Sequence, residues 1–142
     1  MTTLVKVFIF FVISQTVLFA QNNTAQDITV KVNNLNSNNG KVYVSLYNSE
    51  TSFLDKGFKA TFTAVENNSC EVTFKDVPEG IYAISLFHDE NQNNKMDSNF
   101  LGIPKEDYGC SNNARGFMGP PKWEDAKFEV KNGQHINQQI KL

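Results

Sequence analysis

The chain has 142 residues and a formal net charge of −2, with 13 basic and 15 acidic side chains. Once a leader is discounted, the remaining length suits one domain that buries roughly two thirds of its unfolded surface, so its core does not depend on a crosslink. A mildly acidic chain without a basic patch argues against nucleic acid or an anionic lipid as the partner.

The first 20 residues predict a secretory signal peptide. One lysine precedes an apolar run from Val7 to Ile13, and apolar character returns before Ala20, where we expect cleavage. An uncleaved membrane anchor is the alternative, but the run is short and interrupted for a span of roughly 20 residues. We therefore expect a secreted or periplasmic protein without a membrane span in the mature chain, in which residues 21–26 form a flexible leader and residues 27–142 form one domain.

Short runs of alternating apolar and polar residues, separated by turn signals, predict seven β-strands. Both faces of the run over residues 80–87 are fairly apolar, which predicts a central strand. Seven strands at this spacing favour an all-β Greek-key sandwich of immunoglobulin or transthyretin type, and a small closed barrel is the alternative. The runs cover residues 27–32, 41–48, 58–66, 70–75, 80–87, 126–130 and 136–142.

The alternation stops between His88 and Glu124, where Asn, Gly, Pro and scattered aromatic residues dominate. A loop of this length inside a compact domain is uncommon. It is either functional or carries a short element that periodicity does not reveal.

Side chains that carry oxygen atoms fall at alternate positions at the start of this loop, in the sequence DENQNNKMD. Their spacing is similar to that of the calcium loops of EF-hand and thrombospondin-type repeats, and hard cations such as Ca²⁺ prefer oxygen ligands. Asn94 stands in place of the usual glycine and Phe100 in place of the last EF-hand ligand, so the affinity would be weak. The alternative is a polar loop whose Asp and Asn side chains cap their own turns. The candidate calcium ligands are Asp89, Asn91, Asn93, the carbonyl of Lys95, and Asp97.

His88, beside Asp89 and Glu90, raises two enzymatic hypotheses, a transition-metal site and acid–base catalysis. The other histidine, His135, lies in the last predicted hairpin, and a lone histidine is more often structural. Ser111 is a weak hydrolase candidate because no nucleophile elbow surrounds it. We therefore predict a protein without enzymatic activity.

Cys70 and Cys110 are the two cysteines of the chain, and in an oxidising compartment they predict a disulfide. Closing this loop would contribute on the order of 4 kcal/mol in the chain-entropy model. Two free thiols are the alternative, because a bridge requires Cα atoms within reach of each other.

The second half of the long loop is dense in aromatic residues, glycine and proline. These side chains could cover one end of the sandwich, or they could form an exposed apolar patch for a protein, glycan or envelope partner. The candidate partner residues are Tyr108, Phe117, Met118 and Trp123. The sequence thus supports two roles, a structural calcium module and a binding or adhesion module that uses residues 108–123.

Motifs spread over most of the chain carry a family resemblance. They are PEGIYA at 78–83, HDEN at 88–91, Asn93, Lys95–Asp97, LGIP at 101–104, Glu106, Gly109, Ser111–Asn113, Gly119–Pro121 and Asp125–Ala126. From Gly40 to about Leu142 the chain resembles the bacterial domain of unknown function 2141 family. The resemblance implies a secreted or periplasmic β-sandwich without an assigned activity, and it marks residues 88–97 as the signature loop of the family.

Overall fold

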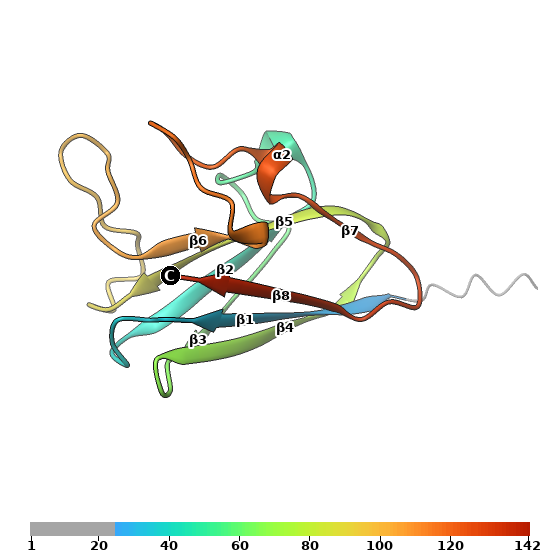
Figure 1. Ribbon diagram of the computed structural model, residues 1–142, viewed down its shortest axis with the longest axis horizontal. Coiled ribbons are helices and arrows are strands. Elements are labelled where there is room, and N and C mark those ends of the chain that lie inside the picture. Colours follow the sequence, from blue (N-terminus) through green and yellow to red (C-terminus); the bar gives the residue numbers. More distant parts are fainter. Residues whose placement is uncertain (1–24) are drawn as a thin grey trace, which may run out of the picture.

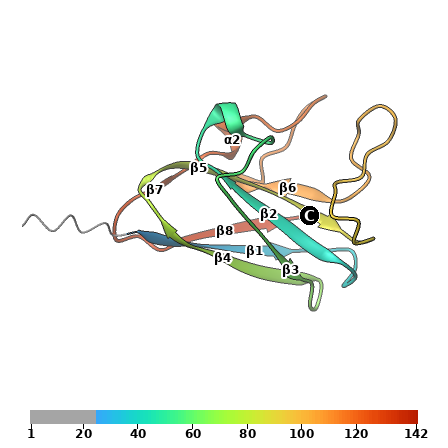
Figure 2. The same ribbon diagram turned by 180° about the vertical axis from the view of Figure 1, so that it is seen from behind.

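Two β-sheets packed face to face form the domain, as Figures 1 and 2 show. The structure is a computed structural model, and it describes residues 25–142. The predicted signal peptide over residues 1–20 and most of the predicted leader over residues 21–26 lie outside the described residues. The β-sandwich predicted from the sequence is confirmed.

The smaller sheet has three strands in the order β4-β1-β8. In it, β1 (Gln26–Asn33) runs antiparallel to β4 (Ser69–Val77) and parallel to β8 (Ile136–Lys141). Alternate apolar residues of β1 are fully buried between the two sheets, because successive side chains of a strand point to opposite faces.

The larger sheet has the order β3-β2-β5-β6, and β7 pairs with β5 as well. As predicted, β5 is central, because it pairs with β2 along one side and with both β7 and β6 along the other. Its inner face buries Tyr82, Ile84 and Leu86. The strands are β2 (Lys41–Tyr47), β3 (Lys59–Ala64), β5 (Gly80–Asp89), β6 (Tyr108–Cys110) and β7 (Phe128–Val130).

Ser111 fills the gap between β7 and β6 along the edge of β5. β7 pairs with residues 80–82 and β6 with residues 85–87, so the backbone of Ile84 has no strand partner on this side. The Ser111 hydroxyl accepts a hydrogen bond from the Ile84 N–H at 2.9 Å and donates one to the carbonyl of Ala126 at 2.5 Å. This buried hydroxyl is therefore engaged in holding three segments of backbone together.

The outer edge of β8 is covered by side chains from the segment after β6. In the short 3-10 helix η2 (Ser111–Asn113), Asn113 accepts a hydrogen bond from the Lys141 N–H at 2.9 Å and donates one to the Gln139 carbonyl at 3.3 Å. Arg115 donates to the Lys141 carbonyl at 3.4 Å. Asn113 and Arg115, which follow β6 of the larger sheet, thus bond the edge of β8 where a fourth strand of the smaller sheet would lie.

A second apolar cluster covers part of the outer face of the larger sheet. Trp123, the first residue of the single-turn helix α2 (Trp123–Ala126), is only 8% exposed, and its ring lies 5.7 Å from that of Phe53, which follows η1 (Glu50–Ser52). The prediction that Trp123 contributes to a partner surface is therefore wrong, because its indole fills this cluster. The cluster contains Tyr47, Phe53, Ala83, Cys110, Ala114, Trp123 and Ala126.

The two cysteines are free, so the structure lacks the predicted disulfide. Cys70 packs against the core between the sheets, whereas Cys110 belongs to the cluster on the outer face of the larger sheet. The backbone of the larger sheet therefore separates the two thiols. Burial raises the pKa of each thiol to about 11, which disfavours the reactive thiolate. Among the described residues, no helix is long and apolar enough to cross a membrane.

Candidate functional site

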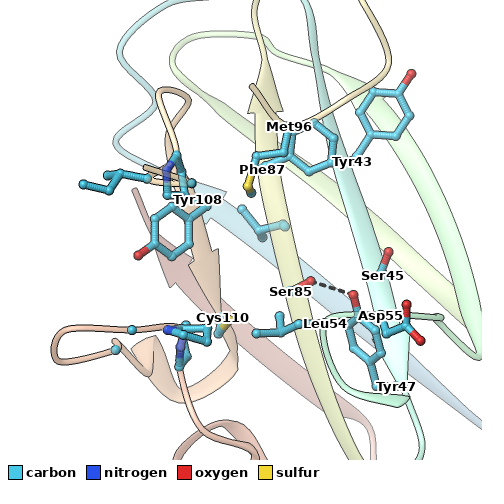
Figure 3. A pocket seen from close by; sticks show the side chains of 18 of the residues that line it. Tyr43, Ser45, Tyr47, Leu54, Asp55, Ser85, Phe87, Met96, Tyr108 and Cys110 are labelled. Atoms are coloured by element: carbon cyan, nitrogen blue, oxygen red, sulfur yellow. Dashed lines mark hydrogen bonds between the residues drawn. The ribbon is translucent and has the colours of Figure 1, made fainter. Parts of the chain in front are cut away.

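The outer face of the larger sheet is open beyond the Trp123 cluster, and there it forms a groove of about 1040 Å³ (Figure 3). Its floor consists of outward-pointing side chains of three adjacent strands. The pairing register places Tyr43 of β2 opposite Phe87 of β5, and Phe87 opposite Tyr108 of β6. A row of three aromatic side chains therefore crosses the sheet.

The rings of Tyr43 and Phe87 stack, with centroids 5.2 Å apart and planes inclined by 11°. Phe62 of β3 extends the row from the other side, 5.4 Å from Tyr43. Offset ring pairs of this kind stabilise one another and keep their orientation. The floor is therefore a pre-formed apolar surface.

The first wall of the groove is a short hairpin over residues 98–104, which rises beyond the end of β5 (Figures 1 and 2). Asn99 shapes its turn, because the side-chain oxygen accepts hydrogen bonds from the N–H groups of Leu101 and Ile103, at 2.9 and 3.0 Å. Both apolar side chains line the groove and are largely exposed, and Met96, just before the hairpin, lines it as well and is 39% exposed. This wall is held by polar turn contacts rather than by a core of its own.

The second wall is the loop over residues 116–121. It turns sharply at Gly116, where an added Cβ would lie 1.7 Å from the Gly119 carbonyl oxygen, so only glycine fits. Met118 lines the groove and is 94% exposed, whereas its neighbour Phe117, 93% exposed, is outside the groove lining. Of these two consecutive side chains, only Met118 belongs to the surface of the groove.

Polar groups on the floor are few, and several are paired with one another. The hydroxyl groups of Tyr47 and Ser85 lie 3.0 Å apart, as the dashed line in Figure 3 marks, and the Tyr43 hydroxyl donates to the side-chain oxygen of Asn94 at 2.5 Å. Asp55 is the one charged side chain among the described residues that line the groove. The remaining surface suits an apolar ligand with a small polar part.

The sequence predicted part of this site. Tyr108 and Met118 line the groove as candidates for a partner surface, and Phe117 is exposed beside it. The missed residues are those of β2, β5 and the first wall. The alternation of β2 indicated that Tyr43 points away from the core. It could not indicate a site, because only the pairing register of β2 and β5 places Phe87 beside Tyr43.

The predicted calcium loop is ordered by its own hydrogen bonds. The buried carboxylate of Asp89 accepts the N–H groups of Asn93 and Asn94 at 3.1 and 2.8 Å. Asn94 adopts a φ of 63°, which asparagine tolerates better than most residues. Both oxygen atoms of Asp89 are therefore used as caps of the turn.

Asp97 lies at the other end of the same turn. The side-chain amides of Asn91 and Asn93 donate to its carboxylate at 2.6 and 2.9 Å, while the Lys95 N–H donates to the Asn93 side-chain oxygen at 2.9 Å. These two amide donors lower the pKa of the Asp97 carboxyl group, and Lys105 and Lys95 add to the effect. The structure thus brings the predicted ligands together, with amide hydrogens rather than oxygens directed at Asp97.

His88 is fully buried at the end of β5. Its Nε2 donates to the Asn39 carbonyl at 2.7 Å, which fixes the link before β2, and its Nδ1 lies 3.6 Å from a carboxylate oxygen of Glu90. His135 instead lies near Thr29 of the smaller sheet. Within residues 25–142, no three His, Cys, Asp or Glu side chains are grouped in a way that could hold a metal ion.

Comparison with known proteins places the chain in a family. A model of the family described as "Uncharacterized protein conserved in bacteria (DUF2141)" matches residues 30–138. The chain belongs to the DUF2141 family. The match covers the larger sheet, most of the smaller sheet, both walls of the groove and the Asp89–Asp97 turn of this DUF2141 protein. Neither the comparison with curated proteins nor the comparison with solved structures found a match.

Proposed function

We propose that this protein is a secreted, non-catalytic binding module, and that the groove on the outer face of its larger sheet binds a neutral apolar ligand. The observation that carries the proposal is the groove itself, an open volume of about 1040 Å³ with an aromatic floor and largely exposed apolar walls. Exposed apolar surface of this extent is uncommon unless it binds something. The predicted signal peptide supports a location outside the cytoplasm.

The chemistry of the lining supports binding rather than catalysis. Asp55 has no histidine or second acid beside it in the lining, and burial raises the pKa of the Cys110 thiol to about 11, which makes it a poor nucleophile. A catalytic site needs a positioned acid, base or nucleophile. A ligand would instead be held by ring faces and methyl groups, with the Tyr108 hydroxyl available for a polar part.

The proposal is tested with the neutral apolar fluorophore N-phenylnaphthylamine and a protein comprising residues 25–142, which contain both sheets and both apolar clusters. We expect the fluorescence to rise on binding and to be lost in the Met118→Asp variant, whose new charge lies in the wall. The matched control is Phe117→Asp, which changes an equally exposed neighbour outside the groove. Equal fluorescence in both variants, or no signal with the wild type, would rule the groove out as the site.

We propose calcium binding by the Asp89–Asp97 turn as a second, supporting role. The observation in its favour is the convergence of Asn91, Asn93 and Asp97 on one point. If the two carboxamides rotated by half a turn, their oxygens would face the Asp97 carboxylate, an arrangement that only a cation between them would stabilise. Since this turn leads directly into the first wall, an ion here would stiffen the groove.

Thermal melts of residues 25–142 in CaCl₂, MgCl₂ and EDTA test this role. A native-state ligand at ten times its dissociation constant adds about 1.4 kcal/mol, which raises the melting temperature by several degrees. Asp97→Asn should abolish a calcium-specific rise. Asp89→Ala is the poorer test, because it also removes two caps of the turn. Identical melting temperatures in calcium and EDTA would contradict calcium binding and mean that the turn is held by its hydrogen bonds alone.

A further inference from the structure

A trough crosses the floor of the groove, one row of side chains away from the aromatic row. The pairing register places Ser45 of β2 opposite Ser85 of β5, and Ser85 opposite Cys110 of β6. All three side chains line the groove, and they are smaller than the rings beside them. Since paired strands lie about 4.8 Å apart, the three positions span about 10 Å. The trough therefore has room for a flat ring system that lies across the strands.

The backbone is strained at two places in the lining of the groove. Leu54 and Met118 have positive φ values of 63° and 55°, and both side chains line the groove. Every other non-glycine residue with a positive φ in the described part of the chain is Asn, Asp or Gln. A bulky apolar residue in this conformation is an outlier, and such strain is typical of positions that contact a ligand. The two apolar outliers thus both point to the groove as a binding site.

The one charged side chain among the described residues of the lining lies at an end of the trough. In Figure 3 Asp55 lies beside Ser45 and Tyr47, whereas Cys110 lies on the other side of β5. The segment of Asp55 closely approaches this end, because an added Cβ at Gly57 would lie 3.4 Å from the Ser45 Cβ. The Asp55 carboxylate forms no hydrogen bond or ion pair with another described residue. This end of the trough therefore offers an unused hydrogen-bond acceptor.

This carboxylate restricts the polar part of a ligand. An ionised carboxyl group only accepts hydrogen bonds, so a ligand hydroxyl group can donate to Asp55, whereas a ligand carboxylate would be repelled. Lys56 follows Asp55 in the sequence, but it is exposed and lies outside the lining, so its ammonium group does not provide an anion site in the trough. A ligand ammonium group would gain little from an exposed ion pair and would lose more hydration than a hydroxyl group.

From these observations we infer that the groove binds a planar apolar alcohol, with its rings in the trough and its hydroxyl group donating to Asp55, and that Asp55 excludes apolar carboxylates such as fatty acids. The inference rests on the proposed function, because it names the ligand class of the same groove. Leu54 and Met118 contact the edges of the bound rings.

Titration calorimetry with two matched compounds tests the inference on a protein comprising residues 25–142. The compounds, 2-naphthalenemethanol and 2-naphthoate, share one ring system and differ in the polar group. We expect the wild type to bind the alcohol about tenfold or more tightly than the carboxylate. In Asp55→Asn this ratio should fall to about threefold or less, because the amide is uncharged and still has an acceptor oxygen. The control, Glu50→Gln, removes an exposed carboxylate of the same segment outside the lining and should keep the wild-type ratio.

A second variant tests the contact made by Leu54. Leu54→Asn keeps the positive φ, which asparagine tolerates, and removes an apolar side chain that is 40% exposed. We expect binding of the alcohol to weaken about fivefold or more, while the melting temperature stays the same or rises. A leucine that only stabilised the fold would instead lower the melting temperature when replaced and leave the affinity unchanged, and that result would remove Leu54 from the ligand contact.

Four results would overturn the inference. They are equal binding of the alcohol and the carboxylate by the wild type, no binding of the alcohol, an unchanged ratio in Asp55→Asn, and tighter binding of 2-naphthylmethylammonium than of the alcohol. The proposed function is judged separately, by N-phenylnaphthylamine. Binding of that probe together with any of the four results would leave the groove as a binding site without this selectivity. No binding of the probe or of the naphthyl compounds would overturn both proposals.

Discussion

The hydroxyl group of Ser111 lies 2.9 Å from the backbone nitrogen of Ile84, at the point where β5 has neither β6 nor β7 beside it. A side chain thereby completes the hydrogen bonding of a central strand. The same hydroxyl donates to the Ala126 carbonyl, so it also holds α2 against the sheet.

Ser111→Ala should therefore lower the free energy of unfolding by about 1–3 kcal/mol, the cost of leaving a buried backbone group unpaired. Urea denaturation followed by circular dichroism measures the change. Ser45→Ala is the control, because that hydroxyl lies in the groove and makes no hydrogen bond to another described residue. A loss of less than about 0.5 kcal/mol in Ser111→Ala would show that the gap in the sheet is filled in another way.

Trp123→Ala should destabilise the domain by about 3–5 kcal/mol, because the indole fills the cluster on the outer face and contacts Phe53. Phe117→Ala, also in the second half of the long loop, should change the free energy of unfolding by less than about 0.5 kcal/mol, since that ring is 93% exposed. Denaturant unfolding separates the two. Similar stabilities of the variants would contradict the packing of Trp123.

Gly40→Ala should destabilise strongly, because an added Cβ would lie 2.0 Å from the Asp89 carbonyl oxygen. A comparison with a second glycine distinguishes the effect of this close contact from the effect of the positive φ. Gly133 has the same φ, +76°, and no atom within 4 Å of its added Cβ, so Gly133→Ala should lose only about 1–2 kcal/mol from the positive φ. Thermal melts of both variants measure the difference. Equal losses would mean that Gly40 is required for its φ alone.

The lowered pKa of Asp97 has a direct test. Its carboxyl group should titrate below the reference value of 3.8 in the folded protein, because Asn93 and Asn91 donate to the ionised form. Stability from this group is therefore present above pH 3.8 and is lost as the pH falls through the folded-state pKa. Carboxyl-carbon NMR should show the pKa rising in Asn93→Ala but not in Asn99→Ala, whose side chain serves the hairpin turn. An unchanged pKa of Asp97 in Asn93→Ala would contradict the hydrogen bond between the two side chains.

The two cysteines should resist alkylation in the folded protein, since burial raises the pKa of both thiols to about 11 and leaves little thiolate near pH 8. Mass spectrometry after iodoacetamide treatment should show both thiols modified only in denaturant. Dithiothreitol should leave the melting temperature unchanged. A drop in melting temperature on reduction would restore the disulfide that the sequence predicted.

Periodicity predicted the long strands because each buries alternate residues on one face, as Ile28 and Val30 do in β1. It missed β6, because three residues around Gly109 are too few to show an alternation, and a Cβ at that glycine would meet Ile140 at 2.7 Å across the sandwich. It missed α2 for the same reason of length.

The candidate site was only partly predictable because it depends on register. Tyr43 and Phe87 are 44 positions apart in the numbering and become a stacked pair only when β2 and β5 align. The absence of the predicted disulfide also depends on the pairing of the strands, which places Cys70 against the core between the sheets and Cys110 on the outer face of the larger sheet. Local spacing did bring Asp89, Asn93 and Asp97 together, because the hydrogen bonds among the residues of this turn span six positions or fewer.

The carboxamide of Asn113 substitutes for two backbone groups along the outer edge of β8. An unprotected sheet edge recruits strands from other molecules and starts fibril growth. Along this edge of β8, the Gln139 carbonyl and the Lys141 N–H are already bonded to the Asn113 side chain, and a further strand cannot add to a side chain. Contacts between the exposed apolar tips of two molecules, around Phe100 and Phe117, therefore cannot continue along this edge as an intermolecular sheet.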